Sequence, residues 1–169
     1  MDFVILVDNS DNPIGQMEKL EAHQTGALHR AFSVFVFNSK KEILLHKRAD
    51  SKYHCGGLWT NTCCSHQRPE ESTLEAAKRR LKEEMGMQCD LKEIFSFTYQ
   101  VEFKNGLIEH EYDHVLIGIS DDKPEINLEE VSAFTYKSVE AIKEDLLTNE
   151  GNYTPWFKIA MDKLPQHIA

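Results

Sequence analysis

Apolar residues recur at the spacing of a helix between residues 71 and 86. Steps of three and four residues place side chains on one helical face. Ser72 stands three residues before Glu75, as in a capping box, and Gly86 suits the end of a helix. The pattern predicts an amphipathic helix over 71–86. Its apolar positions are Leu74, Ala77, Leu81 and Met85.

Strand patterns fill much of the remaining chain. Residues 97–103 alternate apolar and polar side chains, the period of a strand with one buried face. Residues 31–37 are apolar on both faces apart from Ser33, which is typical of a strand inside a sheet. Further helices are predicted over 138–147 and 155–164. These helices and strands together predict a fold of the α/β (α+β) class. The predicted strands are 3–7, 31–37, 43–45, 97–103, 107–119 and 134–136.

Turn-forming residues connect neighbouring strands. Residues 9–13 are rich in Asn, Asp and Pro, so a hairpin is expected at the start of the fold. Residues 38–41 form a second turn, which joins 31–37 to 43–45, and these two strands are predicted to be a central pair of the sheet. An Asn-Gly pair at 105–106 is a strong hairpin signal.

Length, composition and charge limit the classes of protein that fit. A chain of 169 residues with 41% hydrophobic side chains predicts one domain, spanning residues 1–169. The net charge of -9 argues against nucleic acid or an anionic membrane as a partner. Residues 3–7 resemble neither a secretory signal nor a membrane span, so we expect a cytoplasmic monomer. The four cysteines lack C-x-x-C spacing and are expected to be free thiols.

Two glutamates share one face of the predicted strand 107–119. The period of two places Glu109 and Glu111 together and His110 on the opposite face. Two neighbouring carboxylates need a cation, a shared proton or water. The alternative is an edge strand with a solvated acidic face.

Three histidines are candidate partners for these carboxylates. His23, His29 and His66 lie in polar or Gly-flanked connecting segments, where a neutral imidazole can join carboxylates on a metal. Their spacing matches neither H-E-x-x-H nor a zinc finger. Three surface histidines are therefore the alternative.

Cys64 is a candidate nucleophile or acid, although a buried cysteine more commonly serves as a small apolar residue. Nearby Lys or Arg side chains and a cation would lower its pKa toward neutrality. Arg80 and Glu84 share a helix face, where an ion pair is the modest explanation. Trp156 is by default a core aromatic residue. The other basic candidates are, taken singly, ordinary charges: Lys19, Arg48 and Lys52.

The helix resembles the Nudix box, a Gly, five residues, Glu, seven residues, then Arg-Glu-apolar-x-Glu-Glu-x-Gly-apolar. Ser65 replaces the opening Gly, and Arg80 takes the position of a metal-binding Glu. Such a charge reversal should abolish the usual magnesium cluster. The register here is Ser65, Glu71, Arg79, Arg80, Leu81, Glu83, Glu84, Gly86 and Met87.

Nearly the whole chain resembles the type I isopentenyl diphosphate isomerases, a family with a Nudix-like fold. The resemblance implies a single domain in which helices sandwich a mixed β-sheet. The segments that carry it are Leu20-Glu21-Ala22-His23, Leu28-His29-Arg30-Ala31-Phe32-Ser33, Lys47-Arg48-Ala49-Asp50-Ser51-Lys52, Trp59-Thr60-Asn61-Thr62-Cys63-Cys64-Ser65-His66, Glu109-His110-Glu111 and Thr154-Pro155-Trp156-Phe157.

The resemblance also implies two metal sites and a site for the substrate diphosphate. Glu84 would hold Mg²⁺ bound to the diphosphate, and one Zn²⁺ or Mn²⁺ would occupy a separate site. The ligands implied for this second ion are His23, His29, His66, Glu109 and Glu111. The residues implied for the diphosphate are Lys19, Arg48, Lys52 and Arg80.

The implied reaction, part of isoprenoid precursor biosynthesis, converts isopentenyl diphosphate to dimethylallyl diphosphate. A proton joins the terminal methylene, a tertiary carbocation forms, and the neighbouring CH₂ loses a proton. In the family, Glu111 is taken as the donor, assisted by Tyr99, and Cys64 as the base, while Trp156 would stabilise the cation. The alternatives are a Nudix pyrophosphohydrolase, which Arg80 disfavours, and a non-catalytic metal-stabilised binding module.

Overall fold

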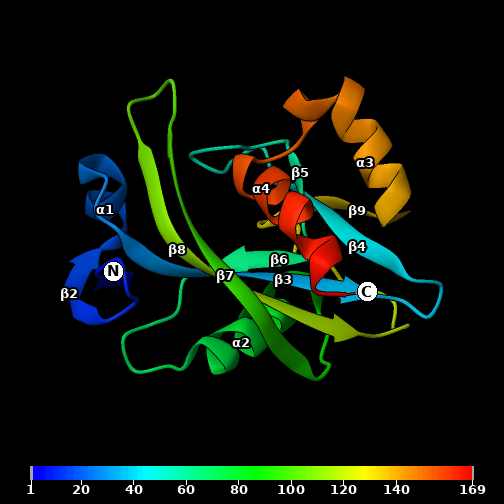
Figure 1. Cartoon of the computed structure of the whole chain (residues 1–169), viewed down its shortest axis with the longest axis horizontal. Helices are drawn as coiled ribbons and strands as arrows, with labels where there is room; N and C mark the ends of the chain where they lie inside the picture. The colour runs from blue at the N-terminus through cyan, green and yellow to red at the C-terminus, as the bar shows by residue number, and fades with distance from the viewer. Residues whose placement is uncertain (1, 169) are drawn as a thin grey trace.

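A computed structural model describes residues 2–168 of the chain (Figure 1). Four α-helices and nine strands make up most of it, with two short 3-10 helices near the C-terminus. The helices are α1 Lys19–Thr25, α2 Thr73–Met85, α3 Val139–Thr148 and α4 Pro155–Lys163, with 3-10 turns η1 Glu150–Asn152 and η2 Leu164–Gln166. The strands are β1 Phe3–Val7, β2 Pro13–Glu18, β3 His29–Phe37, β4 Glu42–Arg48, β5 Trp59–Thr60, β6 Cys63–Ser65, β7 Leu91–Glu102, β8 Ile108–Ile119 and β9 Val131–Ser138.

Strand β3 is the centre of a mixed sheet. It runs parallel to β8 from the pair His29 and Glu111 to the pair Phe37 and Ile119. Its other edge meets β1, β6 and β4 in turn, all antiparallel. The expected hairpin at the start of the fold is present as β1 and β2.

The predicted pairing of 31–37 with 43–45 is present, but it is shorter than expected. Strands β3 and β4 pair only at Phe37 and Ile43, beside the turn that joins them. Beyond this point β4 pairs with β9 along its length. The sheet curls where the two strands part.

Helices cover both faces of the sheet, as the predicted fold class requires. Alternation along β3 sends Phe32 and Val34 into a core with α2, while Phe35 packs into a second core with α3 and α4. Figure 1 shows α2 on one side of the sheet and α4 on the other. The active-site candidates lie between these layers.

Helix α2 begins and ends as its sequence predicts. The Ser72 side chain accepts from the backbone N–H of Glu75, whose carboxylate accepts from the Ser72 N–H. Gly86 ends the helix at φ 63°, and a Cβ there would lie 2.7 Å from the Glu125 carbonyl oxygen. The buried stripe differs at one position, because Leu74 is 41% exposed.

The sequence patterns did not predict α1, β5 or β6, which are short. None of the helices in the described part of the chain combines the length and apolar character that a membrane span requires.

Candidate active site

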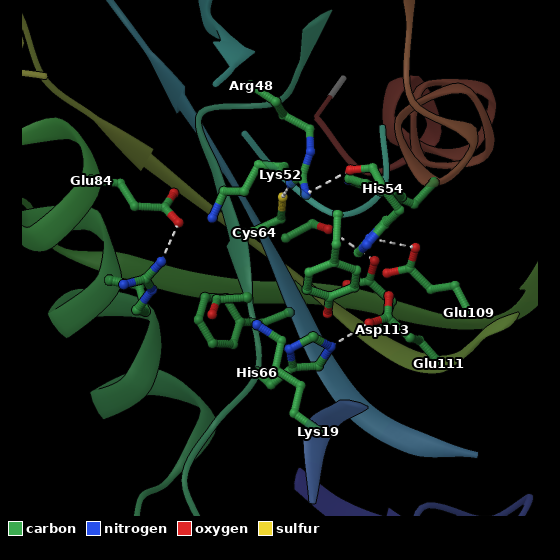
Figure 2. Close-up of a pocket in the computed structure, with 16 residues that line it drawn as sticks. Lys19, Arg48, Lys52, His54, Cys64, His66, Glu84, Glu109, Glu111 and Asp113 are labelled. Carbon is green, nitrogen blue, oxygen red and sulfur yellow. Dashed lines mark hydrogen bonds and ion pairs between the residues drawn. The ribbon is translucent and has the colours of Figure 1, made fainter. Parts of the chain in front are cut away.

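A pocket opens beside β3, β6 and β8, and side chains from α1, α2, α4 and the loop after β4 complete its lining (Figure 2). The structure places ten predicted site residues directly in this lining. His23, His29 and Tyr99 are buried just behind it. The ten lining residues are Lys19, Arg48, Lys52, Cys64, His66, Arg80, Glu84, Glu109, Glu111 and Trp156.

The alternation of β8 turns its acidic residues into the pocket. Glu109 and Glu111 are each 4% exposed, so the alternative of a solvated acidic face does not apply. His110 lies on the opposite face, where its Nδ1 atom is 3.0 Å from the Gly26 carbonyl oxygen. The strand period predicted this division of side chains.

Three strands contribute one row of side chains across the sheet. His29 on β3 and Tyr99 on β7 are the register partners of Glu111 on β8. The Tyr99 hydroxyl donates a hydrogen bond to Glu111 Oε1. Backbone pairing therefore sets the position of the Glu111 carboxylate from both sides.

The three predicted histidines gather around Glu111. His66 Nε2 lies 2.6 Å from Glu111 Oε2, and His29 Nε2 lies 3.4 Å from the same oxygen. The Nε2 atoms of His29 and His66 are 3.2 Å apart. One ligand atom from each of His23, His29, His66 and Glu111 falls within 4.8 Å of the others.

The orientation of two imidazoles fits a metal site. The Nδ1 atom of His23 lies 2.7 Å from the Lys19 carbonyl oxygen, and that of His29 lies 2.9 Å from the Ala27 carbonyl oxygen. Donation from Nδ1–H to a carbonyl leaves Nε2 as the ligand atom. Within residues 2–168, the buried His23 Nε2 has no hydrogen-bond partner. The donor set is compatible with a divalent cation.

Glu109 belongs to a neighbouring group rather than to this set of four. Its Oε2 lies 3.1 Å from Nε2 of His54, and these two residues share His23 as a third potential ligand. The structure thus divides the five side chains implied for one ion between two adjoining groups.

The environments of the two glutamates push their pKa values apart. Burial raises the pKa of Glu109 well above its usual value, and the adjacent Glu111 charge raises it further. Burial opposes ionisation of Glu111 also, but hydrogen bonds from His29 and His66 outweigh it and lower the pKa of Glu111 well below normal. Burial lowers the pKa of His66 to about 3. Glu111 is the carboxylate that carries charge.

All four predicted basic residues lie around the same pocket, and carboxylates hold two of them. Lys52 Nζ pairs with Glu130. Arg80 lies 2.6 Å from Glu84 Oε1 and 3.4 Å from Glu130 Oε1. Glu84 is 4% exposed, and its Oε2 lacks a partner among the described residues. A buried, unsatisfied carboxylate oxygen suits a Mg²⁺ ligand.

Cys64 faces the pocket from β6, in register with Ser33 on β3. Arg48 Nη1 lies 3.9 Å from its Sγ atom. Burial nevertheless raises the pKa of the Cys64 thiol, because it outweighs the opposing charge of Arg48. Arg48 alone therefore does not bring the pKa of the Cys64 thiol toward neutrality.

Trp156 lies at the start of α4 and is 3% exposed, yet it lines the pocket. Arg48 Cζ lies 5.3 Å from the centroid of its ring, a cation–π distance. The ring thus already faces a positive charge.

Sequence analysis did not assign five polar residues of the lining to the site: Ser33, Tyr53, His54, Ser65 and Asp113. Asp113 shares the strand face of Glu109 and Glu111, and its Oδ2 accepts a 2.8 Å hydrogen bond from Ser33. The same period of two and the polar Ser33 in an apolar strand were signals for this pair. Tyr53 and His54 lie in an irregular loop, where no periodic signal exists.

Similar proteins are found for nearly the whole chain. Residues 27–157 match the family described as NUDIX domain. An isopentenyl-diphosphate Delta-isomerase of Pectobacterium atrosepticum is 50% identical over 164 residues, which cover 97% of this chain and 92% of that protein. An isopentenyl-diphosphate Delta-isomerase 2 of Photorhabdus laumondii is 54% identical over 159 residues, covering 93% and 89%.

Solved structures share the same curled sheet. DR0079 of Deinococcus radiodurans aligns with a TM-score of 0.79 over 99% of this chain and 100% of that one, at 17% identity. The MutT protein of Methanosarcina mazei aligns with a TM-score of 0.66 over 82% and 94%, also at 17% identity. At such low identity the likeness concerns the fold alone.

Proposed function

The chain belongs to the NUDIX family and, within it, to the isopentenyl-diphosphate Delta-isomerases, and from this membership we propose how its pocket works. The enzyme converts isopentenyl diphosphate to dimethylallyl diphosphate, so its substrate is a small molecule. We propose that residues 1–169 act as one domain. We also propose that the monomer is active, because a single chain supplies the whole lining of the pocket.

The substrate diphosphate is proposed to bind at the basic end of the pocket. Lys19, Arg48, Lys52 and Arg80 gather positive charge there, although the chain as a whole has a net charge of -9. Glu130 must release Lys52 and Arg80 when the diphosphate arrives. This exchange replaces a carboxylate by a more highly charged anion.

Two groups of side chains are proposed to hold divalent cations. Glu84 would hold Mg²⁺ beside the diphosphate. A Zn²⁺ or Mn²⁺ would be held by the histidine and glutamate group, and a bound cation there supplies positive charge and a fixed arrangement of ligands. The proposal is supported by the unpartnered His23 Nε2 and Glu84 Oε2. The proposed ligands of this second ion are His23, His29, His66, Glu109 and Glu111.

Cys64 and Glu111 are proposed to exchange protons with opposite sides of the substrate. A donor adds a proton to the terminal methylene carbon, which leaves a tertiary carbocation, and a base removes a proton from the neighbouring CH₂. We assign Glu111, assisted by Tyr99, as donor and Cys64 as base. Because Cys64 retains its proton and Glu111 is ionised in the described arrangement, a proton must leave Cys64 and one must reach Glu111 before turnover.

Trp156 is proposed to stabilise the carbocation through its ring face. A cation over a tryptophan ring gains about 2 kcal/mol or more when it is desolvated. The buried ring also keeps water from the cation, which water would otherwise quench.

One assay tests this function. Purified enzyme receives isopentenyl diphosphate and Mg²⁺ in heavy water, and the product is analysed for dimethylallyl diphosphate and incorporated deuterium. We expect both. The observation that carries the proposal is the convergence of Cys64, Glu111 and the basic residues on one pocket. Release of phosphate without an isomerised alkene would favour a pyrophosphohydrolase instead, and metal-dependent stability without turnover would favour a binding module.

A further inference from the structure

His54 is a buried side chain of the pocket that the proposed chemistry does not use. It lies in the loop between β4 and β5, and its side chain is 7% exposed. Aromatic neighbours surround the ring, whose centroid lies 4.6 Å from that of Tyr53, 5.2 Å from that of Phe103 and 6.1 Å from that of Trp156. Burial and the charge of Arg48 lower the pKa of His54 to about 2, so the imidazole is neutral at pH 7. A neutral imidazole is a common metal ligand.

The His54 ring approaches a carboxylate oxygen closely without forming a hydrogen bond to it. His54 Nε2 lies 3.1 Å from Glu109 Oε2, and Figure 2 shows the two side chains pointing toward each other. Glu109 also interacts with Tyr99 and Glu111, but among residues 2–168 its buried Oε2 atom has no hydrogen-bond partner. Leaving such an oxygen unsatisfied in a buried position is costly, so a further partner is expected.

The distances between the polar atoms of this region match those between ligands of one ion. Nitrogen and oxygen ligands lie about 2.1 Å from a cation such as Zn²⁺, so two neighbouring ligands lie about 3.0 to 3.4 Å apart. The 3.1 Å between His54 Nε2 and Glu109 Oε2 falls in this range. The Nε2 atoms of His29 and His66, which are 3.2 Å apart, show the same spacing. His66 and Glu111 are closer, at 2.6 Å, because a hydrogen bond joins them.

His23 connects the two groups of potential ligands. Its Nδ1 atom lies 2.7 Å from the Lys19 carbonyl oxygen, so Nε2 is the atom left to bind a cation. This buried Nε2 has no hydrogen-bond partner in the described part of the chain, and His23 belongs to both groups. Its ring lies 5.6 Å from the ring of His54 and 5.6 Å from that of His66, between centroids. Because an imidazole nitrogen has a single lone pair, the two groups converge on one ion rather than on two.

We propose that His54 is a ligand of this ion, in addition to the five side chains of the proposed function. The inference rests on that proposed metal site and extends it from three imidazoles to four. With the carboxylates of Glu109 and Glu111, the ion would have six protein ligands. Six ligands are typical of Mn²⁺, whereas Zn²⁺ in structural sites is almost always four-coordinate. An ion enclosed in this way keeps no open position for water, so its part is to hold the two glutamates in place.

Two substitutions separate His54 from the other histidines. His54→Phe keeps an aromatic ring beside Tyr53 and Phe103 but removes the ligand atom. The matched control is His110→Asn, because His110 lies on the face of β8 that points away from the pocket. The asparagine amide can take over the contact of His110 Nδ1 with the Gly26 carbonyl oxygen, so this change removes an imidazole and keeps its contact.

The full-length proteins are stripped of metal with a chelator and titrated with Mn²⁺ alone. Continuous-wave electron paramagnetic resonance follows free Mn²⁺, and pulsed resonance counts the imidazole nitrogens bound to the ion. We expect one tightly bound Mn²⁺ per chain, with four bound imidazoles in the wild type and in His110→Asn and three in His54→Phe. Mn²⁺ affinity should fall more than about 10-fold in His54→Phe, because even the loss of a residue outside the coordination sphere costs about 10- to 100-fold. His110→Asn should stay within about threefold of the wild type.

The possible failures differ in what they overturn. A wild-type protein that binds no Mn²⁺ would refute the proposed metal site on which the role of His54 rests. A wild-type protein that binds Mn²⁺ through three imidazoles would refute the role of His54 and leave that site intact. This count needs no variant, so it also decides the matter if His54→Phe does not fold. Weaker binding by His54→Phe with an unchanged number of nitrogens would also show that His54 is not a ligand.

Discussion

The Tyr99 hydroxyl donates a hydrogen bond to Glu111 Oε1, and the two residues are directly paired across the antiparallel strands β7 and β8. His29 is the partner of Glu111 on the other side. The proposed proton donor is thus fixed by the sheet rather than by a loop.

Tyr99→Phe removes this hydrogen bond and leaves the ring in place. Because hydrogen bonds to charged groups contribute about 1.5–3 kcal/mol, we expect kcat to fall roughly 10- to 100-fold with little change in KM. Steady-state assays at saturating substrate measure the effect. Tyr112→Phe is the control, since Tyr112 lies on the opposite face of β8. An equal loss in both variants would contradict the specific role of Tyr99.

Adjacent cysteines offer a second comparison. Cys64 faces the pocket, whereas Cys63 is buried in the core beneath α2. Cys64→Ser should lower kcat by about 100- to 10,000-fold, because proton transfer by a positioned group contributes this much. Cys63→Ala should retain turnover and lose about 1 kcal/mol of stability. Activity assays measure kcat of both variants, and urea unfolding measures their stability. Full turnover by Cys64→Ser would remove Cys64 from the mechanism.

Glu130 neutralises two residues proposed for the diphosphate. Its carboxylate pairs with Lys52 and Arg80, so Glu130→Gln should free both side chains. We expect inorganic pyrophosphate to bind about two- to fivefold more tightly, the range of a partly exposed ion pair. Calorimetry measures the dissociation constant. Glu129→Gln makes the same charge change at an exposed neighbour and should have a smaller effect. Weaker binding by Glu130→Gln would contradict the competition between Glu130 and the diphosphate.

Stability should fall in acid partly because of His46. This residue is 2% exposed, its Nδ1 lies 3.0 Å from the Thr62 carbonyl oxygen, and burial lowers its pKa from 6.5 to about 4. The unfolded chain therefore binds a proton at higher pH than the folded one. The contribution of buried, neutral His46 to the free energy of unfolding is complete above pH 6.5. It declines by about 3 kcal/mol as the pH falls to about 4.

The variant His46→Asn isolates this contribution. Asparagine can donate to the Thr62 oxygen from near the Nδ1 position, but it does not gain a proton. Urea unfolding between pH 7 and pH 4 should show a flatter decline of the unfolding free energy than in the wild type. Parallel declines in the two proteins would contradict the assignment to His46.

Sequence patterns predicted the features that depend on local spacing. The capping box of α2 and the common face of Glu109 and Glu111 follow from periods of 3.6 and 2, and both are present. The parallel pairing of β3 with β8 has no such local signal, since it joins segments far apart in the chain. The predicted pair of 31–37 with 43–45 forms only beside its turn, because a turn guarantees adjacency only there.

Prediction of the candidate site was limited in the same way, because contacts between distant segments leave no local signal in the sequence. The family resemblance named the basic residues, but not the carboxylate of Glu130 that holds two of them. It named Glu109 as one of five ligands, but not the contact with His54 that separates it from the others. Irregular loops supplied both missing side chains, and their positions depend on tertiary packing.

The pairing of His29 with Glu111 has a consequence for the newly made polypeptide. His23, His29 and His66 are synthesised before Glu111. The Glu111 carboxylate can reach them only after β8 has paired with β3. A nascent chain that still lacks β8 would carry imidazoles without an acidic counterpart. If this group binds the proposed ion, binding would therefore have to follow translation of β8.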